Sequence, residues 1–279
     1  ILSEAKTLQR YWGKRNTKMK DWYEQIKMVD TLAQKDMESF VGNDPRTAFN
    51  LISGILNQRI PHRLPPSSLN VSQIQPAAEL SALFDTIWEN VEETYRLRGR
   101  KLKKDIIDFM LITGWCSVFG VPSQDGSSFF VEAWSPITVY PRWGNMLSKC
   151  AHIFTPGKEA IELMAVRNGW KLRSTVSDAT EVVDYWWIVQ SLNSIEVHDS
   201  IMIGNDQVKP DTIDPRFPRI PIFVFPVSGL PDTGELSKGS QDWKQDMGQS
   251  VIATNENIYK TVNKWWTFMM QLLRDTAQA

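Results

Sequence analysis

The sequence predicts an α+β protein in which helical segments flank a β-rich middle. Residues 4–41, 76–111 and 240–276 carry apolar side chains at helical spacing. Residues 116–235 instead contain turn signals and runs of β-forming residues. Hydrophobic residues make up 42% and charged residues 23%, which is typical of a globular chain and excludes wholesale disorder.

The first predicted helix covers residues 4–41, and Gly13 is the point at which it can break. A second helix is predicted to begin at Asn43-Asp44-Pro45, because Pro is favoured just inside a helix cap. It must end before residues 61–66, which contain three Pro and form an extended crossing segment.

A long helix is predicted over residues 76–111, with Gly99 as its dividing point. Its charges are polarised along the chain. Residues 85–93 are rich in acidic side chains, whereas residues 96–104 are rich in basic ones. Such blocks mark solvated faces or faces that meet another subunit.

The middle of the chain shows strands and tight turns. Residues 129–139 and 182–189 favour strands, and residues 194–208 favour a hairpin. Residues 218–226 hold three Pro, which cannot donate to a ladder, so this segment belongs at a sheet edge or in a crossing segment. Turns are predicted at Asp125-Gly126, Asn168-Gly169 and Gly204-Asn205.

The last predicted helix covers residues 240–276 and has a near-heptad row of apolar side chains, here called the apolar seam. The apolar seam consists of Val251, Ile258, Val262, Trp265, Met269 and Leu272. Polar side chains lie off this row: Asn257, Lys260, Lys264, Gln271 and Arg274. The seam predicts a packing face, and the polar row predicts a face toward solvent.

The composition argues against several classes of protein. The 31 Lys and Arg against 32 Asp and Glu leave a net charge of −1, which argues against a free-standing protein that grips duplex DNA by its phosphates. Twelve Trp and 12 Phe indicate extensive burial, subunit interfaces included. Two Cys are too few for a disulfide framework or a cysteine zinc site. No apolar stretch is long enough to span a membrane.

No catalytic motif considered for this sequence is complete. Residues 234–240 have the glycine spacing of a phosphate loop but lack the Lys that follows the second Gly. His62, His152 and His198 lie far apart, without the spacing of a zinc site. His198-Asp199 is interpreted as part of a hairpin rather than as an acid/base pair. Asp105 and Asp108 are interpreted as a solvated or salt-bridged helix face rather than as part of a Mg²⁺ site. We therefore expect no catalytic residue, no metal and no cofactor, although spacing does not exclude two distant carboxylates of a hydrolase.

The order of the segments provides the strongest signal. A basic first helix carrying Trp and Tyr is followed by a helix that runs into a Pro-rich crossing. The long helix then ends in Thr113-Gly114 and feeds a β-rich region that contains Trp134-Ser135-Pro136. A Pro-rich extended segment leads finally into the last helix. This order resembles that of the portal, or head-to-tail connector, proteins of tailed bacteriophages.

The resemblance implies an architecture and a function. It implies a helical wing base over residues 1–115, a β-rich wing and clip region over 116–235, and a stem helix over 236–279. It implies a ring, normally of twelve subunits, at one capsid vertex, through which double-stranded DNA is packaged and ejected. The implied partners are the terminase motor, the major capsid protein and tail or adaptor proteins, in a virion assembled in the host cytoplasm. Family members continue past the stem helix, so we expect this sequence to be part of a longer chain.

Within such a ring, the last helix would line the channel and the charged blocks would meet between subunits. We expect Lys260, Lys264, Arg274, Asn257 and Gln271 to face DNA. We expect subunit contacts at Trp265, Val262, Arg100, Lys101, Glu92 and Glu93. The alternatives are another phage head-tail adaptor or minor capsid protein, and a soluble enzyme with dispersed carboxylates.

Overall fold

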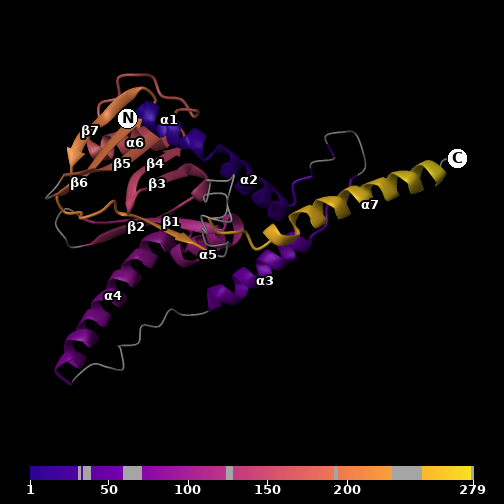
Figure 1. Cartoon of the computed structure of the whole chain (residues 1–279), viewed down its shortest axis with the longest axis horizontal. Coiled ribbons are helices and arrows are strands. Elements are labelled where there is room, and N and C mark those ends of the chain that lie inside the picture. The colour runs from indigo at the N-terminus through magenta and orange to yellow at the C-terminus, as the bar shows by residue number, and fades with distance from the viewer. Residues whose placement is uncertain are drawn as a thin grey trace. The chain divides into compact units, whose positions relative to one another are not determined.

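The computed structural model describes residues 1–30, 33, 39–58, 71–123, 128–191, 194–227 and 247–277. These residues form a mixed α+β structure, as the sequence predicts, and its strands make two antiparallel sheets (Figure 1). They group into two compact units, each assembled from segments that are distant in sequence. Residues 1–17 and 134–223 make the first unit, and residues 18–133 and 224–279 make the second. None of the described helices combines the length and apolar character of a membrane span.

The first unit is built on a five-stranded antiparallel sheet whose strands follow one another in chain order. The strands are β3 (Val139–Trp143), β4 (Leu147–Phe154), β5 (Val182–Gln190), β6 (Ile195–Ile203) and β7 (Asp206–Ile213). Gly204 and Asn205 form the two-residue turn between β6 and β7, and Gly204 has a φ of 57°. The hairpin predicted over residues 194–208 is therefore confirmed, as is the strand over 182–189.

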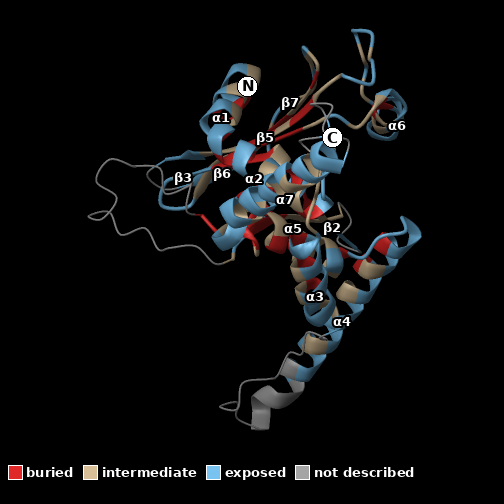
Figure 2. Cartoon of the chain, turned by 90° about the vertical axis from the view of Figure 1, so that its right-hand side faces the viewer, coloured by how far each residue is buried: buried red, intermediate tan, exposed pale blue. Residues whose placement is uncertain are grey.

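Two helices cover opposite faces of this sheet. Helix α1 (Leu2–Tyr11) packs on β3, β4 and β5, where Glu4 accepts a hydrogen bond of 2.6 Å from the Tyr185 hydroxyl. Helix α6 (Lys158–Asn168) buries Ile161 against Val182 and Ile203. Side chains alternate between the faces of a strand, so Val182 and Tyr185 point to opposite sides. The buried residues run through the strands in Figure 2.

The second unit combines helices with a three-stranded sheet. Its helices are α3 (Asp44–Gln58), α4 (Val71–Leu97), α5 (Leu102–Thr113) and α7 (Glu256–Ala277), together with the part of α2 (Gly13–Lys27) from Lys18 onward. In its sheet, β1 (Trp115–Pro122) lies between β2 (Phe129–Trp134) and β8 (Ile222–Pro226). The Pro-rich strand β8 is an edge strand, as predicted. Helices α4 and α5 and strand β2 share a core around Val91, Tyr95 and Leu102.

A contact between two glycine backbones connects α5 to the start of the last helix. Gly114 caps α5 at a φ of 84°, and its carbonyl accepts a hydrogen bond from Val227 N at 2.8 Å. The carbonyl of Val227 in turn accepts from Gln249 N at 3.0 Å, and Leu111 O accepts from Val251 N at 2.9 Å. A Cβ added to Gly248 would lie 1.8 Å from the Gly114 oxygen, a distance that no packed atom tolerates. The chain thus arrives at α7 through a site that only glycine fits.

Several predicted boundaries are wrong for identifiable reasons. The first helix breaks into α1 and α2 near Gly13, as expected. Helix α2 ends at Lys27 rather than near residue 41, because the next residue, Met28, has a φ of 61°. The last helix begins at Glu256 and not before residue 250, because residues 248–251 are bonded to Leu111 and Val227 instead. Asn168-Gly169 ends helix α6, which the sequence did not predict, rather than turning a hairpin. Strand β4 was also missed.

Other predictions hold or lie outside the described residues. Helix α3 begins at Asp44, and the long helix divides around Gly99 into α4 and α5. The Pro-rich crossing at residues 61–66, the Asp125-Gly126 turn and the glycine-containing stretch 234–240 fall outside the described residues. The division into residues 1–115, 116–235 and 236–279 stays a prediction, since it names regions of a portal subunit rather than compact units.

A buried acidic side chain lies in the sheet of the first unit. Asp184 on β5 stands opposite His152 on β4 and Ile201 on β6, and its buried Oδ1 has no hydrogen-bond partner in the part of the chain that the structure describes. Burial raises its pKa from the usual 3.8 to about 7, and the nearby charge of Asp199 adds to the rise. Lys209, which pairs with Asp199, and the Trp186 indole act in the opposite direction. The ionised form of Asp184 is therefore destabilised in the folded state.

This raised pKa predicts how stability depends on pH. The folded protein holds the Asp184 proton up to about pH 7, whereas the unfolded chain releases it near the usual value of 3.8. The contribution of Asp184 to the free energy of unfolding must then fall between about pH 4 and 7 and level off above. Urea unfolding of the wild type and of Asp184→Asn across this range should show a difference that grows and then becomes constant. A difference that does not vary with pH would contradict the assignment.

The glycine contact predicts a large effect of one added methyl group. Gly248→Ala must displace the Gly114 backbone and hold a residue with a Cβ at a φ of 69°, which together should cost more than about 2 kcal/mol of unfolding free energy. Gly54→Ala on α3 is the matched control, because nothing lies within 4 Å of its Cβ position. In a helix interior, that change should stabilise the protein by about 0.5–1 kcal/mol. Urea unfolding measures both, and equal effects would contradict the contact.

Candidate functional site on the last helix

Helix α7 faces its own chain with its polar side. Phe40 N donates to the Thr267 hydroxyl at 3.0 Å, and Gly42 N donates to Asn263 Oδ1 at 2.9 Å. Thr267 is only 3% exposed and is the one buried residue among those of α7 that the structure describes. At the start of the helix, Glu256 accepts a hydrogen bond from the indole of the buried Trp22. One row of polar side chains therefore docks α7 on residues 40–42 and on α2.

The apolar side of α7 is largely exposed among the residues that the structure describes, although Trp266 contacts Phe40 with ring centroids 5.9 Å apart. Trp265 is 61% exposed, Phe268 60% and Leu273 65%, and Ile258, Val262 and Leu272 are exposed as well. In Figure 1, α7 extends past the elements that hold its first half. A helix on a globular surface normally turns its apolar stripe to the core and its polar side to water, and α7 does the reverse. The apolar seam predicted for this helix is thus a real stripe, but its helical members are not buried within the chain.

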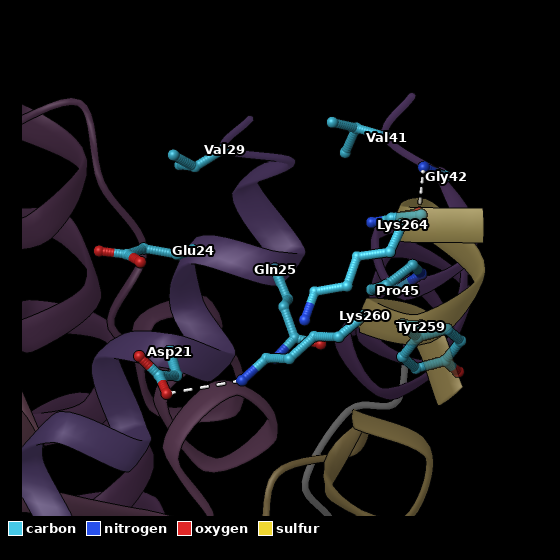
Figure 3. Close-up of a pocket in the computed structure, with 11 residues that line it drawn as sticks. Asp21, Glu24, Gln25, Val29, Val41, Gly42, Pro45, Tyr259, Lys260 and Lys264 are labelled. Atoms are coloured by element: carbon cyan, nitrogen blue, oxygen red, sulfur yellow. Dashed lines mark hydrogen bonds and ion pairs between the residues drawn. The ribbon is translucent and has the colours of Figure 1, made fainter. Parts of the chain in front are cut away.

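A pocket of about 310 Å³ lies beside the polar side of α7 (Figure 3). It is lined by α2, residues 41–45 and α7, and the side chains of Lys260 and Lys264 both extend across it from α7 toward α2. Lys260 Nζ lies 3.6 Å from a carboxylate oxygen of Asp21, so its charge is balanced within the chain. The amide of Gln25 is buried in this region, and neither of its polar atoms has a hydrogen-bond partner among the described residues.

The pocket does not form an anion cradle, although it contains two lysines. Asp21 and Glu24 line it together with Lys260 and Lys264, so positive and negative groups are equal in number. An ion pair of this exposure contributes little to stability, on the order of 0–1 kcal/mol. The arrangement therefore holds α7 against α2 without offering a concentrated charge to a ligand.

The other residues expected to face DNA lie along the same helix. Asn257 and Arg274 are exposed, and Gln271 is half-buried. Lys260 pairs with Asp21 on α2, whereas Lys264 forms no ion pair with the described residues, so Lys260 is less open to DNA than Lys264. All five side chains thus lie on α7.

The charged blocks that were expected to join subunits are partly satisfied within the chain. Arg100 pairs with Asp105 at 2.9 Å, and Glu93 pairs with Arg96. Glu92 accepts a hydrogen bond of 3.1 Å from the backbone N of Lys103. Lys101 lines a second, more open pocket between α3, α4 and α5. These contacts tie α4 to α5 and leave less charge for a neighbouring subunit than the sequence indicates.

The residues considered for catalysis are buried or are held by ion pairs and ring contacts within the chain. His198 contacts Asp211 at 2.8 Å and stacks on Trp187, whereas its neighbour Asp199 pairs with Lys209. Successive strand residues point to opposite faces, so His198 and Asp199 do not act on one another. Burial raises the pKa of Cys116 to about 12, which keeps the thiol protonated.

Asp105 and Asp108, which were considered as metal ligands, are also held by partners within the chain. Asp108 accepts a hydrogen bond of 2.7 Å from Ser53 and pairs with Lys104, while Asp105 pairs with Arg100. Burial raises the pKa of Asp105, although Arg100 opposes that rise. No group of three or more potential metal ligands occurs in the part of the chain that the structure describes.

Sequence reasoning missed the residues that dock α7. Thr267 and Asn263 lie four residues apart on the same side of the helix, and Glu256 precedes Asn263 by seven. This spacing of short polar side chains was the available signal, but it is indistinguishable from a solvated face without the partner amides of Phe40 and Gly42.

Comparison of the sequence with models of protein families gives no match, and comparison with curated proteins gives none either.

The docking of α7 predicts a local effect of one hydroxyl group. Thr267→Val keeps the shape of the side chain but leaves the Phe40 amide without its acceptor, which should cost about 1 kcal/mol. Hydrogen exchange at the Phe40 and Gly42 amides should accelerate several-fold. Thr261→Val is the matched control, because the Thr261 hydroxyl donates to Asn257 O in its own helix. Equal exchange at Phe40 in both variants would show that Thr267 does not hold the helix.

Proposed function

We propose that this chain is a portal protein of a tailed bacteriophage. In this proposal it forms a ring at one capsid vertex, serves as the channel for packaging and ejection of double-stranded DNA, and docks the terminase motor and tail or adaptor proteins. The observation that carries the proposal is the exposed apolar side of α7, on a helix already held by its polar side.

The exposed stripe supports assembly with further copies or partners. Burying a large apolar side chain is worth about 1.5–3 kcal/mol. Seven such side chains stand partly exposed along α7: Ile258, Val262, Trp265, Trp266, Phe268, Leu272 and Leu273. Contiguous apolar surface of this kind is uncommon on a monomer and marks an interaction site.

The order of the elements supports the particular choice of a portal. Helix α5 ends at Thr113 with Gly114 as its cap, and strand β1 begins directly after it. The Pro-rich edge strand β8 precedes the long last helix. This is the order of segments on which the resemblance to portal proteins rests.

The proposed role is structural rather than catalytic. In the portal reading, ATP hydrolysis belongs to a separate terminase motor, and the ring offers DNA only shallow contacts. A net charge of −1 and the pairing of Lys260 with Asp21 suit a channel that must let phosphates slide. Lys264, Arg274 and Asn257 are then the side chains proposed to meet DNA.

Particle imaging and native mass spectrometry of the purified protein test this proposal. We expect a ring with a central hole wide enough for duplex DNA and a mass close to twelve subunits, as the resemblance implies. A protein that stays monomeric at micromolar concentration, at both low and high salt, would refute the portal assignment and favour the enzyme alternative. A ring that does not admit duplex DNA would favour an adaptor or minor capsid role.

A further inference from the structure

The pocket between α3, α4 and α5 differs in content from the pocket beside α7. It has a volume of about 610 Å³, within the range of about 300–1,000 Å³ that is usual for sites of small organic ligands. All of its lining residues belong to the second unit. Aromatic side chains line it from α3 and α4, and lysines line it at the start of α5.

Two aromatic side chains give this pocket an apolar wall. Phe49 on α3 is buried, and Trp88 on α4 is half-buried. Trp88 packs against the core around Val91 and Tyr95, so its position does not depend on a ligand. An aromatic surface that is fixed in this way suits a planar ring, and unpaired nucleobases stack on such surfaces.

Positive charge is in excess in the same pocket. Among the lining residues that the structure describes, Lys101, Lys103 and Lys104 stand against one carboxylate, whereas the pocket beside α7 has two cations and two anions. Lys104 is paired with Asp108, but Lys101 and Lys103 form no ion pair with the described residues. Lys103 Nζ donates to the Asn57 carbonyl at 3.2 Å, a contact that holds the ammonium group without neutralising it. Two cations are therefore left for an anionic ligand.

The one carboxylate of the lining, that of Glu92, lies at the first turn of α5. It accepts a hydrogen bond of 3.1 Å from the backbone N of Lys103. Helix α5 begins at Leu102 without a side-chain cap, and the first turn of a helix favours negative charge. Glu92 thus satisfies a backbone amide, and by like-charge repulsion it also weakens the binding of a second anion beside it.

We propose that this pocket binds a nucleotide, with its phosphate between Lys101 and Lys103 and its base against Trp88. Asn50, an exposed lining residue, adds an amide that can hydrogen-bond the edge of the base. The base must be unpaired, because the faces of a base inside a duplex are covered by its neighbours. A free nucleotide and a single-stranded nucleic acid both offer this chemistry. The inference goes beyond the proposed ring and does not depend on it.

Titration of the full chain with defined probes distinguishes the two sources. The probes are AMP, inorganic phosphate, a fluorescein-labelled single-stranded oligothymidylate and the same strand annealed to its complement. We expect AMP to bind more tightly than inorganic phosphate and the single strand to bind more tightly than the duplex. A single strand that binds more tightly than AMP identifies nucleic acid as the source, and the reverse order identifies the free nucleotide.

Substitutions of the lining test the role of each part of the pocket. Lys101→Gln with Lys103→Gln should weaken binding of the preferred probe about tenfold or more, because charge-assisted contacts to phosphate are lost. Trp88→Leu keeps an apolar side chain against the core and should weaken binding about fivefold or more, whereas Trp88→Phe should retain most of it. Glu92→Gln keeps an acceptor for the Lys103 amide but removes the repulsion, so it should strengthen binding.

Matched controls separate the pocket from general attraction between charges. Lys158→Gln with Lys171→Gln removes two exposed lysines of the first unit and should leave binding unchanged. Thermal melts check that each variant is folded, and Lys101→Gln alone replaces the double variant where loss of the Lys103 contact unfolds the chain.

Several outcomes would overturn the nucleotide site. Absence of binding to AMP and to the single strand would do so, as would equal losses in the pocket variant and the Lys158/Lys171 control. Equal affinity for duplex and single strand, or for AMP and inorganic phosphate, would refute the stacking of a base on Trp88. A short polyaspartate that binds as tightly as the preferred probe would show that the pocket takes acidic peptides instead. Binding by a monomeric protein would leave the nucleotide site in place while refuting the portal proposal.

Discussion

The close approach of Gly114 and Gly248 is the constraint on which the second unit depends. At one point it ends helix α5, starts strand β1, receives the end of β8 through Val227 and sets the path of the chain into α7. Both glycines have positive φ, and neither position has room for a Cβ. Because the hydrogen bonds of Leu111, Gly114 and Val227 are shared among these segments, none of the segments can shift without the others. The direction in which α7 leaves the unit follows from this shared anchor.

The reversed orientation of α7 follows from what that anchor places beside it. The backbone amides of Phe40 and Gly42 and the indole of Trp22 need acceptors, and Thr267, Asn263 and Glu256 supply them. Buried donors left without partners cost free energy, so the polar side is the side that the chain itself can satisfy. The apolar side is then left for another surface. The helix is held by its polar side, and under the proposed function its apolar stripe is the surface that a partner buries.

The sequence predicted patterns better than it predicted which surface each pattern faces. Periodicity located the apolar row through Val262 and Trp265, yet the row is exposed because orientation depends on amides that lie more than 200 residues earlier in the chain. Gly114 was part of a recognised Thr-Gly helix end, whereas nothing local marks Gly248 as its counterpart. Helix α6 was missed because its exposed Leu163 and Val166 obscure the apolar face around Ile161. Likewise, the intrachain pairing of Lys260 with Asp21 depends on two helices that only the fold brings together.

Under the proposed function, these features divide the work of a portal subunit between two sides of one helix. The apolar side would bind the neighbouring copy, and since that contact is built from side chains such as Trp265 and Phe268, salt should weaken it little. The polar side meets its own chain, where Asp21 already balances Lys260. Few cations are then left to hold DNA phosphates, and each contact exposed to water is weak. Strong subunit contacts together with weak DNA contacts are what a ring needs if it is to stay closed while a duplex moves through it.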